Sequence, residues 1–445
     1  MARDLPDDQS TVPTSGLGRG ARMLQIPLGY ASRRTVGLSR RLLGQDRDEV
    51  DAELRQQTAS QVFRVLSELK GGAMKFGQAL SLFEAALPED VAEPYREQLR
   101  RLQDSAAPMP AARVEAVMAQ ELGSRWRDLF SSFDRRPSAA ASIGQVHHAT
   151  WAATGQEAAV KIQYPEADQA LRSDLTAISR LATVIAPVAG GMDVKALVAE
   201  VGERIAEEVD YLREAENQDL ADQAFRDDPD FVVPQVLAAT PRLLVSTWLE
   251  GTPLSEVGSW AEEDRNRVGL SYVRFLFSGP HRAGLLHADP HPGNFLVLPD
   301  GRLGVIDWGL VARLPDGLPE PMGRLIRTAL AGSAEEMTRG LQAEGLVVAD
   351  VDADHLLTYL APFIEPARVS EFHFTRDWMR SQYERLQREA SDVESVMPAL
   401  NVPPVYALIH RVWMGGVAVL CQLDVRARFA DVLAELLPGF AANQG

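Results

Sequence analysis

The stretch that decides the fold runs from Leu285 to Leu310 and reads LLHADPHPGNFLVLPDGRLGVIDWGL. Its first part, His287–Asn294, is expected to be a loop, because its two prolines cannot donate backbone hydrogen bonds and its glycine permits a positive φ. Two short apolar strands, Phe295–Leu298 and Leu303–Ile306, flank the turn signal Pro299-Asp300-Gly301. The stretch therefore predicts a hairpin that has polar residues on both sides.

The polar residues around this hairpin follow a chemical order. Asp289 and Asn294 precede the first strand, and Asp307 follows the second strand two residues before a glycine. The order is typical of phosphoryl transfer, in which a catalytic-loop Asp and a metal-binding Asn are followed by a metal-holding Asp. Turn formation alone explains Asp300 and Gly301, but it is a poor explanation for all three of the other residues together.

Composition restricts the class of protein. The chain has 445 residues and a formal net charge of −17, so we expect two lobes and no sequence-independent binding of nucleic acid. The single cysteine, Cys421, has apolar neighbours and is expected to be a buried thiol, which agrees with a cytoplasmic setting. The sequence shows neither a signal peptide nor a run of 18 apolar residues.

Lysine is scarce in this chain. Only four of the 45 basic residues are lysines, namely Lys70, Lys75, Lys161 and Lys195. Lysine carries a compact ammonium group, whereas arginine is a wide planar fork. The remaining lysines are therefore candidates for sites that only the smaller cation fits, with chance as the alternative reading for Lys195.

The amino-terminal part divides into two regions. Residues 1–45 are expected to form a flexible arm that contains a basic, apolar stretch, Arg19–Gly44. This stretch is expected either to lie on an anionic membrane surface or, as we favour, to form a helix packed on the body. Helical spacing follows from Asp46 to Leu102, where the glycines around Lys75 indicate close packing against another backbone.

The middle of the chain indicates a small sheet. Phe133–Ile162 contains a loop of small residues, Ser138–Gln145, and a returning strand that carries Lys161. A flexible loop followed by a strand lysine is how the small lobe of a kinase holds phosphates. A carboxylate from the predicted helix Lys195–Ala221 should pair with Lys161, but spacing alone does not decide between Glu207 and Glu208.

A strand at Leu243–Leu249 precedes Glu250–Pro253, which resembles a hinge between lobes. The remaining chain is expected to be mostly helical. Helical periodicity covers Ala111–Leu122, Leu318–Leu341, Asp354–Ile364, Trp378–Ala390 and Val405–Leu423.

With these pieces in place, the chain resembles the UbiB family, also called the AarF or ADCK family, of atypical protein-kinase-like proteins. The resemblance runs from about Leu69 to Phe429 and rests on several motifs in order. These are the K-x-G-Q motif at Lys75–Gln78, the alanine-rich loop AAASIGQ at Ala139–Gln145, the strand lysine Lys161, the E-x-D motif at Glu208–Asp210, the catalytic loop His287–Asn294 and the sequence Asp307-Trp308-Gly309.

The resemblance implies a role for each matched residue. It selects Glu208 as the partner of Lys161, and it places Asp289, Lys161, Glu208 and Lys75 among the catalytic residues. Contacts to ATP are implied for Ala139, Ala140, Ala141, Ser142, Gly144, Gln145, Lys161 and Gln78, and Mg²⁺ is implied at Asn294 and Asp307.

The resemblance also implies an α+β, bilobal, protein-kinase-like fold in which helices carrying the K-x-G-Q motif pack over the active-site cleft. The expected division is an arm at 1–45, the helical extension at 46–125, a kinase-like N-lobe at 126–250 and a helical C-lobe at 251–445. The implied activity is that of an atypical kinase or ATPase that hydrolyses ATP or phosphorylates a small or lipid-related acceptor. The setting is cytoplasmic or peripheral at a membrane, with a link to lipid or isoprenoid-quinone metabolism.

Two alternatives remain open at this point. HADPHPGN followed by IDWG also suits a small-molecule phosphotransferase of the aminoglycoside-kinase or choline-kinase type. A non-catalytic lipid-binding scaffold that only keeps the fold is the other. The Lys75 motif and the alanine-rich loop disfavour the first alternative, and the intact Lys161, Asp289, Asn294 and Asp307 disfavour the second.

Overall fold

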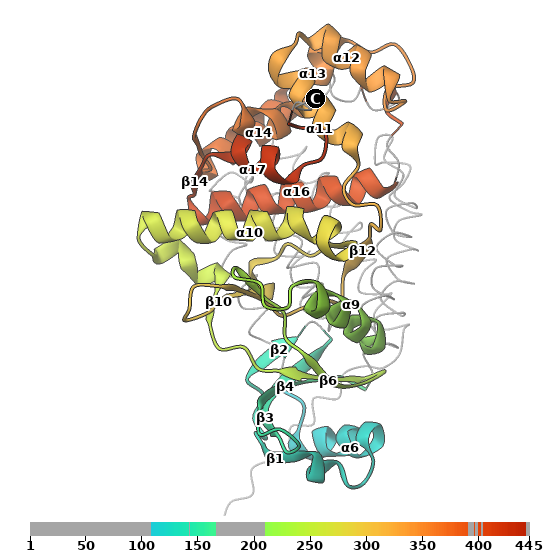
Figure 1. Ribbon diagram of the computed structural model, residues 1–445, viewed down its shortest axis with the longest axis vertical. Helices are drawn as coiled ribbons and strands as arrows, with labels where there is room; N and C mark the ends of the chain where they lie inside the picture. Colours follow the sequence, from blue (N-terminus) through green and yellow to red (C-terminus); the bar gives the residue numbers. More distant parts are fainter. Residues whose placement is uncertain are drawn as a thin grey trace, which may run out of the picture.

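The computed structural model describes residues 108–141, 143–165, 210–389, 396, 399–401 and 404–441. These residues form a mixed α+β fold with an antiparallel sheet at one end and a group of helices at the other (Figure 1). The helical extension expected at 46–125 lies outside the described residues as far as residue 107.

The main sheet has six strands. They are β1 (Phe130–Phe133), β2 (Ala139–Ala141), β3 (Gly144–Trp151), β4 (Glu157–Gln163), β6 (Val236–Thr240) and β7 (Leu243–Thr247), in the order β1-β3-β4-β7-β6 with β2 added to β3. All of these pairings are antiparallel, which confirms the small sheet that the sequence predicted. Lys161 on β4 lies opposite Val146 on β3 and Leu244 on β7.

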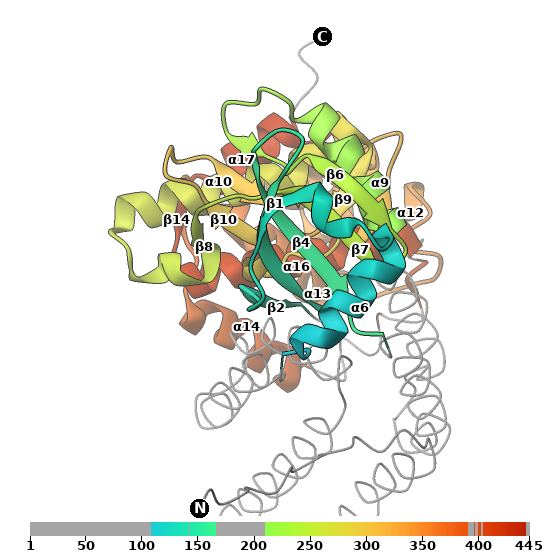
Figure 2. The ribbon, with the colours of Figure 1, turned by 90° about the horizontal axis from the view of Figure 1, so that it is seen from below.

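One face of this sheet is covered by α6 (Ala111–Leu122), which follows the predicted bounds and lies across the strands in Figure 2. Val114, Val117 and Met118 on α6 pack with Val160 and Ile162 of β4 and with Trp126 of the 3₁₀ turn η1 (Trp126–Leu129). Because side chains alternate along a strand, Lys161 lies on the other face of β4. That face carries α9 (Tyr211–Ala224), whose Tyr211 and Ala215 pack against Leu244.

The opening stretch forms the predicted hairpin. Strands β10 (Phe295–Val297) and β11 (Leu303–Val305) pair antiparallel, and Gly301 in their turn has φ of +88°. The hairpin belongs to a second sheet of order β5-β11-β10-β8, completed by β5 (Phe231–Val232) and β8 (Thr252–Pro253). A separate antiparallel pair is formed by β9 (Leu285–His287), at the start of the stretch, and β12 (Val311–Arg313), directly after its end.

The connection between the two sheets is short. After β7, Trp248 donates its backbone N–H to Glu157 at 2.8 Å, and four residues later Thr252 pairs with Val297 of β10. Gly251 is required here, because a Cβ at this position would lie 2.7 Å from the carbonyl oxygen of Val297. The segment predicted to be a hinge therefore passes directly from the main sheet into the second sheet.

Helices make up most of the rest. They are α10 (Glu262–Ala283), α11 (Glu320–Ala331), α12 (Ala334–Ala343), α13 (Ala353–Ile364), α14 (Arg376–Arg388), α16 (Pro404–Leu423) and α17 (Phe429–Leu436), with the short pair β13 (Phe372–His373) and β14 (Arg426–Ala427) and the 3₁₀ turns η3 (Leu254–Ser259), η4 (Pro292–Asn294) and η5 (Glu365–Ala367). The helices predicted at Asp354–Ile364, Trp378–Ala390 and Val405–Leu423 are confirmed within two residues at each end.

Two predicted helices were too long. The helix expected over Leu318–Leu341 is split at Gly332 into α11 and α12. The split follows from a capping box, in which Ser333 and Glu336 each accept a hydrogen bond from the other's backbone N–H. The helix expected over Lys195–Ala221 does not include Asp210, whose extended backbone and side-chain bond to the N–H of Leu212 make it the N-cap of α9. Residues 195–209 of this prediction lie outside the described residues.

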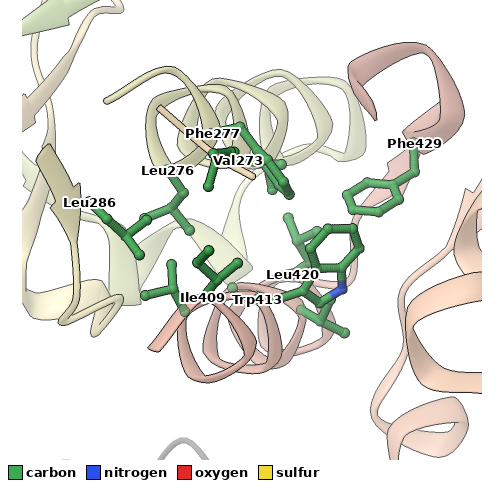
Figure 3. A pocket seen from close by; sticks show the side chains of 12 residues that line it. Val273, Leu276, Phe277, Leu286, Ile409, Trp413, Leu420 and Phe429 are labelled. Atoms are coloured by element: carbon green, nitrogen blue, oxygen red, sulfur yellow. The ribbon is translucent and has the colours of Figure 1, made fainter. Parts of the chain in front are cut away.

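The core of the helical part forms between α10 and α16, which lie side by side in Figure 1. Apolar side chains from both helices surround a cavity of about 20 Å³, with Phe429 of α17 at its edge (Figure 3). Such a space has room for about one water molecule. Cys421 of α16 is buried as predicted, and burial raises the pKa of its thiol. No helix among the described residues is long and apolar enough to cross a membrane.

Candidate functional site

The centre of the candidate site is an ionic triad of Lys161, Glu214 and Asp307. Lys161 Nζ lies 2.7 Å and 3.0 Å from the two carboxylate oxygens of Glu214, and 3.1 Å from Oδ2 of Asp307. The side chains are 15%, 2% and 26% exposed, so only the aspartate keeps a substantial open face. One ammonium group thus joins the main sheet, α9 and the segment after the hairpin.

Electrostatics keeps the lysine charged. Burial alone would lower the pKa of Lys161, but the carboxylates of Asp307 and Glu214 outweigh it and raise the pKa well above its ordinary value. Burial raises the pKa of Glu214, and the negative charge of Asp307 adds to that effect, while the Lys161 ammonium opposes it. Two carboxylates around one ammonium leave one excess negative charge when all three are ionised. The open face of Asp307 is therefore suited to a further cation.

Among the described residues, Glu214 is the helix carboxylate that pairs with Lys161. Glu208 lies outside the described residues, as does Glu207, so the structure says nothing of their positions. Asp210 begins α9, and Glu214 follows in its first turn at a position that is 2% exposed. Glu214 was not predicted from the sequence, because the predicted helix had no break from which to count turns.

The catalytic loop is held by buried hydrogen bonds. Asp289 and Asn294 are 7% and 8% exposed, and Nδ2 of Asn294 donates to the backbone carbonyl of Asp289 at 3.2 Å. With its amide nitrogen engaged in this way, the side-chain oxygen of Asn294 is the atom that could bind a metal ion. The Tyr272 hydroxyl on α10 donates to the carbonyl of Pro290 at 2.6 Å. Burial and the nearby charge of Asp289 raise the pKa of Tyr272 well above its ordinary value, so it remains a hydroxyl donor.

The Asp307-Trp308-Gly309 segment is fixed at each residue. His287 Nε2 donates to the carbonyl of Asp307 at 2.6 Å, and the Gly309 N–H donates to Asp307 Oδ1 at 3.0 Å. The indole of Trp308 is 1% exposed, donates to the carbonyl of Val305 at 3.1 Å, and meets His287 edge-on with ring centroids 5.3 Å apart. No role was predicted for Tyr272 or His287, whose hydrogen bonds hold the catalytic loop and Asp307 in the structure.

The donor set fits Mg²⁺ held together with a phosphate group. Among the described residues there is no cluster of three or more His, Cys, Asp or Glu side chains placed to hold a metal. Mg²⁺ commonly binds one or two protein oxygen donors and takes its other ligands from water and substrate phosphates. The side-chain oxygen of Asn294 and the open carboxylate of Asp307 match that requirement.

The alanine-rich segment differs from the expected loop. Ala139–Ala141 form strand β2, which pairs with Gly144–Val146 of β3, so the segment is a tight hairpin whose tip includes Ile143. Gly144 is required by packing, because a Cβ at this position would overlap with the backbone carbonyl oxygen of Ile162 on β4. Ser142 lies outside the described residues.

Gln145 has a different environment from the one expected. It is 1% exposed, and its neighbour Val146 is the residue opposite Lys161, so alternation puts Gln145 on the α6 side of the sheet. Its side-chain oxygen accepts the N–H of Met109 at 2.7 Å, and its Nε2 lies 2.7 Å from Nε2 of His147. These hydrogen bonds engage the polar atoms of Gln145 inside the protein, so the expected contact of Gln145 with the nucleotide does not agree with the structure.

Four expected site residues are brought together by the structure and four cannot be located. Lys161, Asp307, Asp289 and Asn294 lie at or beside the triad and the catalytic loop. Lys75, Gln78, Ser142 and Glu208 lie outside the described residues.

Comparison with known proteins places this geometry in a family. A model described as the ABC1 atypical kinase-like domain matches residues 101–340, which is more than half of the chain. The chloroplastic ACTIVITY OF BC1 COMPLEX KINASE 3 of Arabidopsis thaliana is 31% identical over 401 residues, which cover 87% of this chain and 53% of that protein. The mitochondrial atypical kinase COQ8 of Saccharomyces cerevisiae is 32% identical over 310 residues, covering 67% of this chain and 60% of that protein.

A solved structure extends the comparison. The complex of Rv3197 with erythromycin from Mycobacterium tuberculosis is 42% identical and superposes with a TM-score of 0.67, covering 89% of this chain and all of that one. The chain spans about half the length of the curated relatives it matches first. The chain belongs to the ABC1 atypical kinase-like family, which is the UbiB or AarF family that its motifs resemble.

Proposed function

We propose that this protein binds Mg²⁺–ATP beside the Lys161–Glu214–Asp307 triad and either hydrolyses it or transfers its terminal phosphate to a small or lipid-related acceptor. The observation that carries the proposal is the contact of Lys161 Nζ with both carboxylates. A strand lysine held between a helix glutamate and an aspartate beside the metal position is the arrangement that kinases require for activity.

Each residue has a proposed task. Lys161 contacts the α- and β-phosphates, while Glu214 holds its ammonium in place. Asn294 and Asp307 hold Mg²⁺, which supplies positive charge to the phosphates when it is bound. Asp289 accepts a proton from the attacking water or hydroxyl, and Tyr272 positions the loop that carries it. The alanine-rich hairpin, Ala139–Ala141 with Ser142 and Gly144, lies toward the phosphates.

The excess negative charge supports a requirement for the metal complex. The triad carries two carboxylates for one ammonium, and free ATP would add further negative charge to a partly buried site. A metal ion removes that repulsion and strengthens the remaining interactions, since the local dielectric is low. We therefore expect Mg²⁺–nucleotide to bind far better than nucleotide alone.

The acceptor is proposed to be small. We divide the chain into the arm 1–45, the helical extension 46–125, an N-lobe at 126–250 and a C-lobe at 251–445, with Lys75 and Gln78 of the extension facing the phosphates. Such a cover excludes bulk water and folded protein substrates. We assign the protein to the cytoplasm, at the periphery of a membrane if the basic arm contacts lipid, and to lipid or isoprenoid-quinone metabolism by its family resemblance.

The test compares nucleotide binding and turnover in wild type and Asp307→Asn. Wild-type protein should gain thermal stability with Mg²⁺–ADP and should turn over Mg²⁺–ATP, with a rate that depends on added lipid if the acceptor or activator is a lipid. Asp307→Asn should lose the Mg²⁺-dependent part of the thermal shift, because a neutral amide holds the metal ion less firmly than a carboxylate does. The control is Asp300→Asn, which alters an exposed carboxylate in the turn of the same hairpin.

The outcomes separate the open readings. An undiminished shift in Asp307→Asn contradicts the metal role. Efficient phosphorylation of aminoglycosides or choline supports a small-molecule phosphotransferase, whereas nucleotide binding without any turnover supports a non-catalytic scaffold.

A second candidate function is binding of a macrolide. It is favoured by the 42% identical solved structure, which is a complex with erythromycin. Adding erythromycin to the same thermal-shift assay, with and without Mg²⁺–ADP, tests this candidate. An erythromycin-dependent shift that survives Asp307→Asn supports a separate macrolide site, and no shift at any concentration up to its solubility removes the candidate.

A further inference from the structure

The backbone carbonyl of Trp308 is held by a side chain of α9, because it accepts a hydrogen bond from Nδ2 of Asn217 at 3.1 Å. Glu214, the partner of Lys161, lies three residues before Asn217 on the same helix, so both side chains reach the same side. Trp308 directly follows Asp307, and its backbone contact with α9 therefore limits how the aspartate can turn.

The amide of Asn217 has only one orientation that satisfies its surroundings. The carbonyl of Trp308 can only accept a hydrogen bond, and the guanidinium of Arg313, whose Nη2 lies 3.0 Å from Asn217 Oδ1, can only donate. Asn217 is 2% exposed, so water cannot replace either partner easily. A side chain with a donor at one end and an acceptor at the other is required here.

Arg313 extends this connection to the catalytic loop. It is the last residue of β12 and lies opposite Leu285 of β9, the strand that leads into His287. His287 donates to the carbonyl of Asp307. The Asp307–Gly309 segment is thus held by α9 on one side and by the β9–β12 pair on the other, with Asn217 touching both.

We infer that Asn217 is a positioning residue for the metal site, which keeps the carboxylate of Asp307 directed at Lys161 and at Mg²⁺ by holding the peptide of Trp308. The inference rests on the proposed Mg²⁺–nucleotide function. It predicts that α9 controls metal affinity through two residues, Glu214 acting on Lys161 and Asn217 acting on the Trp308 carbonyl.

The chain offers a matched control in the next residue. Gln218 is also a buried amide of α9, 1% exposed, and its Nε2 donates to a backbone carbonyl, that of Pro234, at 2.6 Å. Pro234 lies just before strand β6 of the main sheet, so the Gln218 hydrogen bond does not hold the segment of the metal site. Replacing either amide with an apolar side chain removes a hydrogen bond from the same helix to a backbone carbonyl, and at Asn217 it also removes the bond from Arg313. Only Asn217 contacts the segment that carries Asp307.

The experiment measures the affinity of the full chain for ADP by calorimetry, with Mg²⁺ and with EDTA, in wild type, Asn217→Leu and Gln218→Met. The measured quantity is the ratio of the two affinities, which a general loss of stability does not change. Asn217→Leu should lower this ratio about tenfold or more, as expected for the loss of one buried hydrogen bond that holds a ligand. Gln218→Met should keep the wild-type ratio.

Other outcomes decide the matter differently. If Asn217→Leu keeps the wild-type ratio, or if Gln218→Met lowers it equally, Asn217 has no special part in positioning Asp307 and the inference is wrong. If wild type binds ADP no better with Mg²⁺, the proposed function fails, and the inference fails with it. If Asn217→Leu does not fold, Asn217→Ser replaces it with the same expectation, because serine is smaller and also cannot reach both partners.

Discussion

At the scale of single residues, Lys161 shows why this site uses lysine in a chain that otherwise uses arginine. Its ammonium contacts two carboxylates at 2.7 Å and 3.1 Å and lies 5.2 Å from the ring centroid of Tyr211. A compact cation with three donors fits between these groups, whereas a planar guanidinium would need a wider space. The charge alone is therefore not sufficient at this position.

Lys161→Arg tests that argument. The variant keeps the charge but changes its shape, so Mg²⁺–ATP affinity should fall about tenfold, equivalent to about 1.4 kcal/mol. Isothermal calorimetry and steady-state turnover measure it, with Lys195→Arg as the control at a lysine to which we give no role. Wild-type affinity and turnover in Lys161→Arg would contradict the phosphate-binding assignment.

The residues of the site were predictable to different degrees. Asp289, Asn294 and Asp307 were singled out from the sequence because a hairpin fixes their separation along the chain. Glu214 was missed, because its pairing with Lys161 depends on where α9 begins, and that is set by the backbone of Asp210. Asn217 gave no sequence signal, since a single asparagine within a helix pattern does not reveal that a tryptophan carbonyl lies opposite.

At the scale of elements, strong periodicity predicted helices well, while local side-chain bonds decided where they stop. The bounds of α6 and α13 followed from apolar spacing. The break between α11 and α12 depends on the reciprocal bonds of Ser333 and Glu336, which outweigh a continuous periodic pattern. The alanine-rich segment was read as a loop, because small residues do not show the pairing with β3 that makes it a strand.

A buried chain of hydrogen bonds ties β3 to its surroundings. His147 is fully buried, and its Nδ1 donates to the carbonyl of Asp134 at 2.7 Å, so its Nε2 accepts from the amide of Gln145. The Gln145 oxygen in turn accepts the N–H of Met109. A proton added at His147 Nε2 would face the Gln145 amide donor, and the chain of bonds holds only with a neutral imidazole.

This series of buried hydrogen bonds predicts how the free energy of unfolding depends on pH. Burial lowers the pKa of His147 against the opposing hydrogen bond and charge of Asp134. The unfolded chain therefore takes up a proton at a higher pH than the folded protein does. The contribution of His147 to the free energy of unfolding is complete above about pH 6.5, the ordinary pKa of histidine. It is lost as the pH falls from there toward the pKa of His147 in the folded protein, and the free energy changes by up to about 1.4 kcal/mol per pH unit.

Urea unfolding between pH 5 and pH 8 measures that dependence. The free energy of unfolding should fall toward acid in wild type, and this His147 component should be missing in His147→Gln, which cannot titrate. An identical pH dependence in the two proteins would show that His147 does not carry it.

At the scale of the whole molecule, Lys75 tests whether the amino-terminal extension reaches the active site. The family resemblance implies that the K-x-G-Q motif lies on a helix over the cleft, and the scarcity of lysine supports a special role for Lys75 independently. Lys75→Ala should change nucleotide affinity or turnover by about tenfold in either direction, the size of one charge-assisted contact to phosphate, while the melting temperature in the absence of ligand stays near that of wild type. Lys70→Ala, five residues earlier, is the control.

Two results would contradict the covered cleft. One is a Lys75→Ala protein with wild-type binding and turnover. The other is efficient phosphorylation of generic folded proteins, because a covered cleft would not admit them.

The basic stretch Arg19–Gly44 makes a separate prediction for the whole molecule. If it contacts anionic lipid, co-sedimentation with cardiolipin-containing vesicles should decrease as salt is raised, because surface charges are screened. A protein lacking residues 1–44 should bind such vesicles weakly. Equal binding by the shortened protein would instead favour a helix packed on the body.

The burial of Cys421 has a practical consequence for measuring motion. It is the only cysteine of the chain, it is 1% exposed, and its raised pKa leaves little of the reactive thiolate at neutral pH. The unmodified protein should therefore react very little with maleimide reagents. Cysteines introduced at Ala153, in the exposed turn between β3 and β4, and at Val348, 62% exposed in the helical part, would accept a fluorophore pair without removing any native residue of the core. Energy transfer between the two fluorophores, measured on single molecules in solution, would show whether the sheet and the helices approach each other when Mg²⁺–ADP is added.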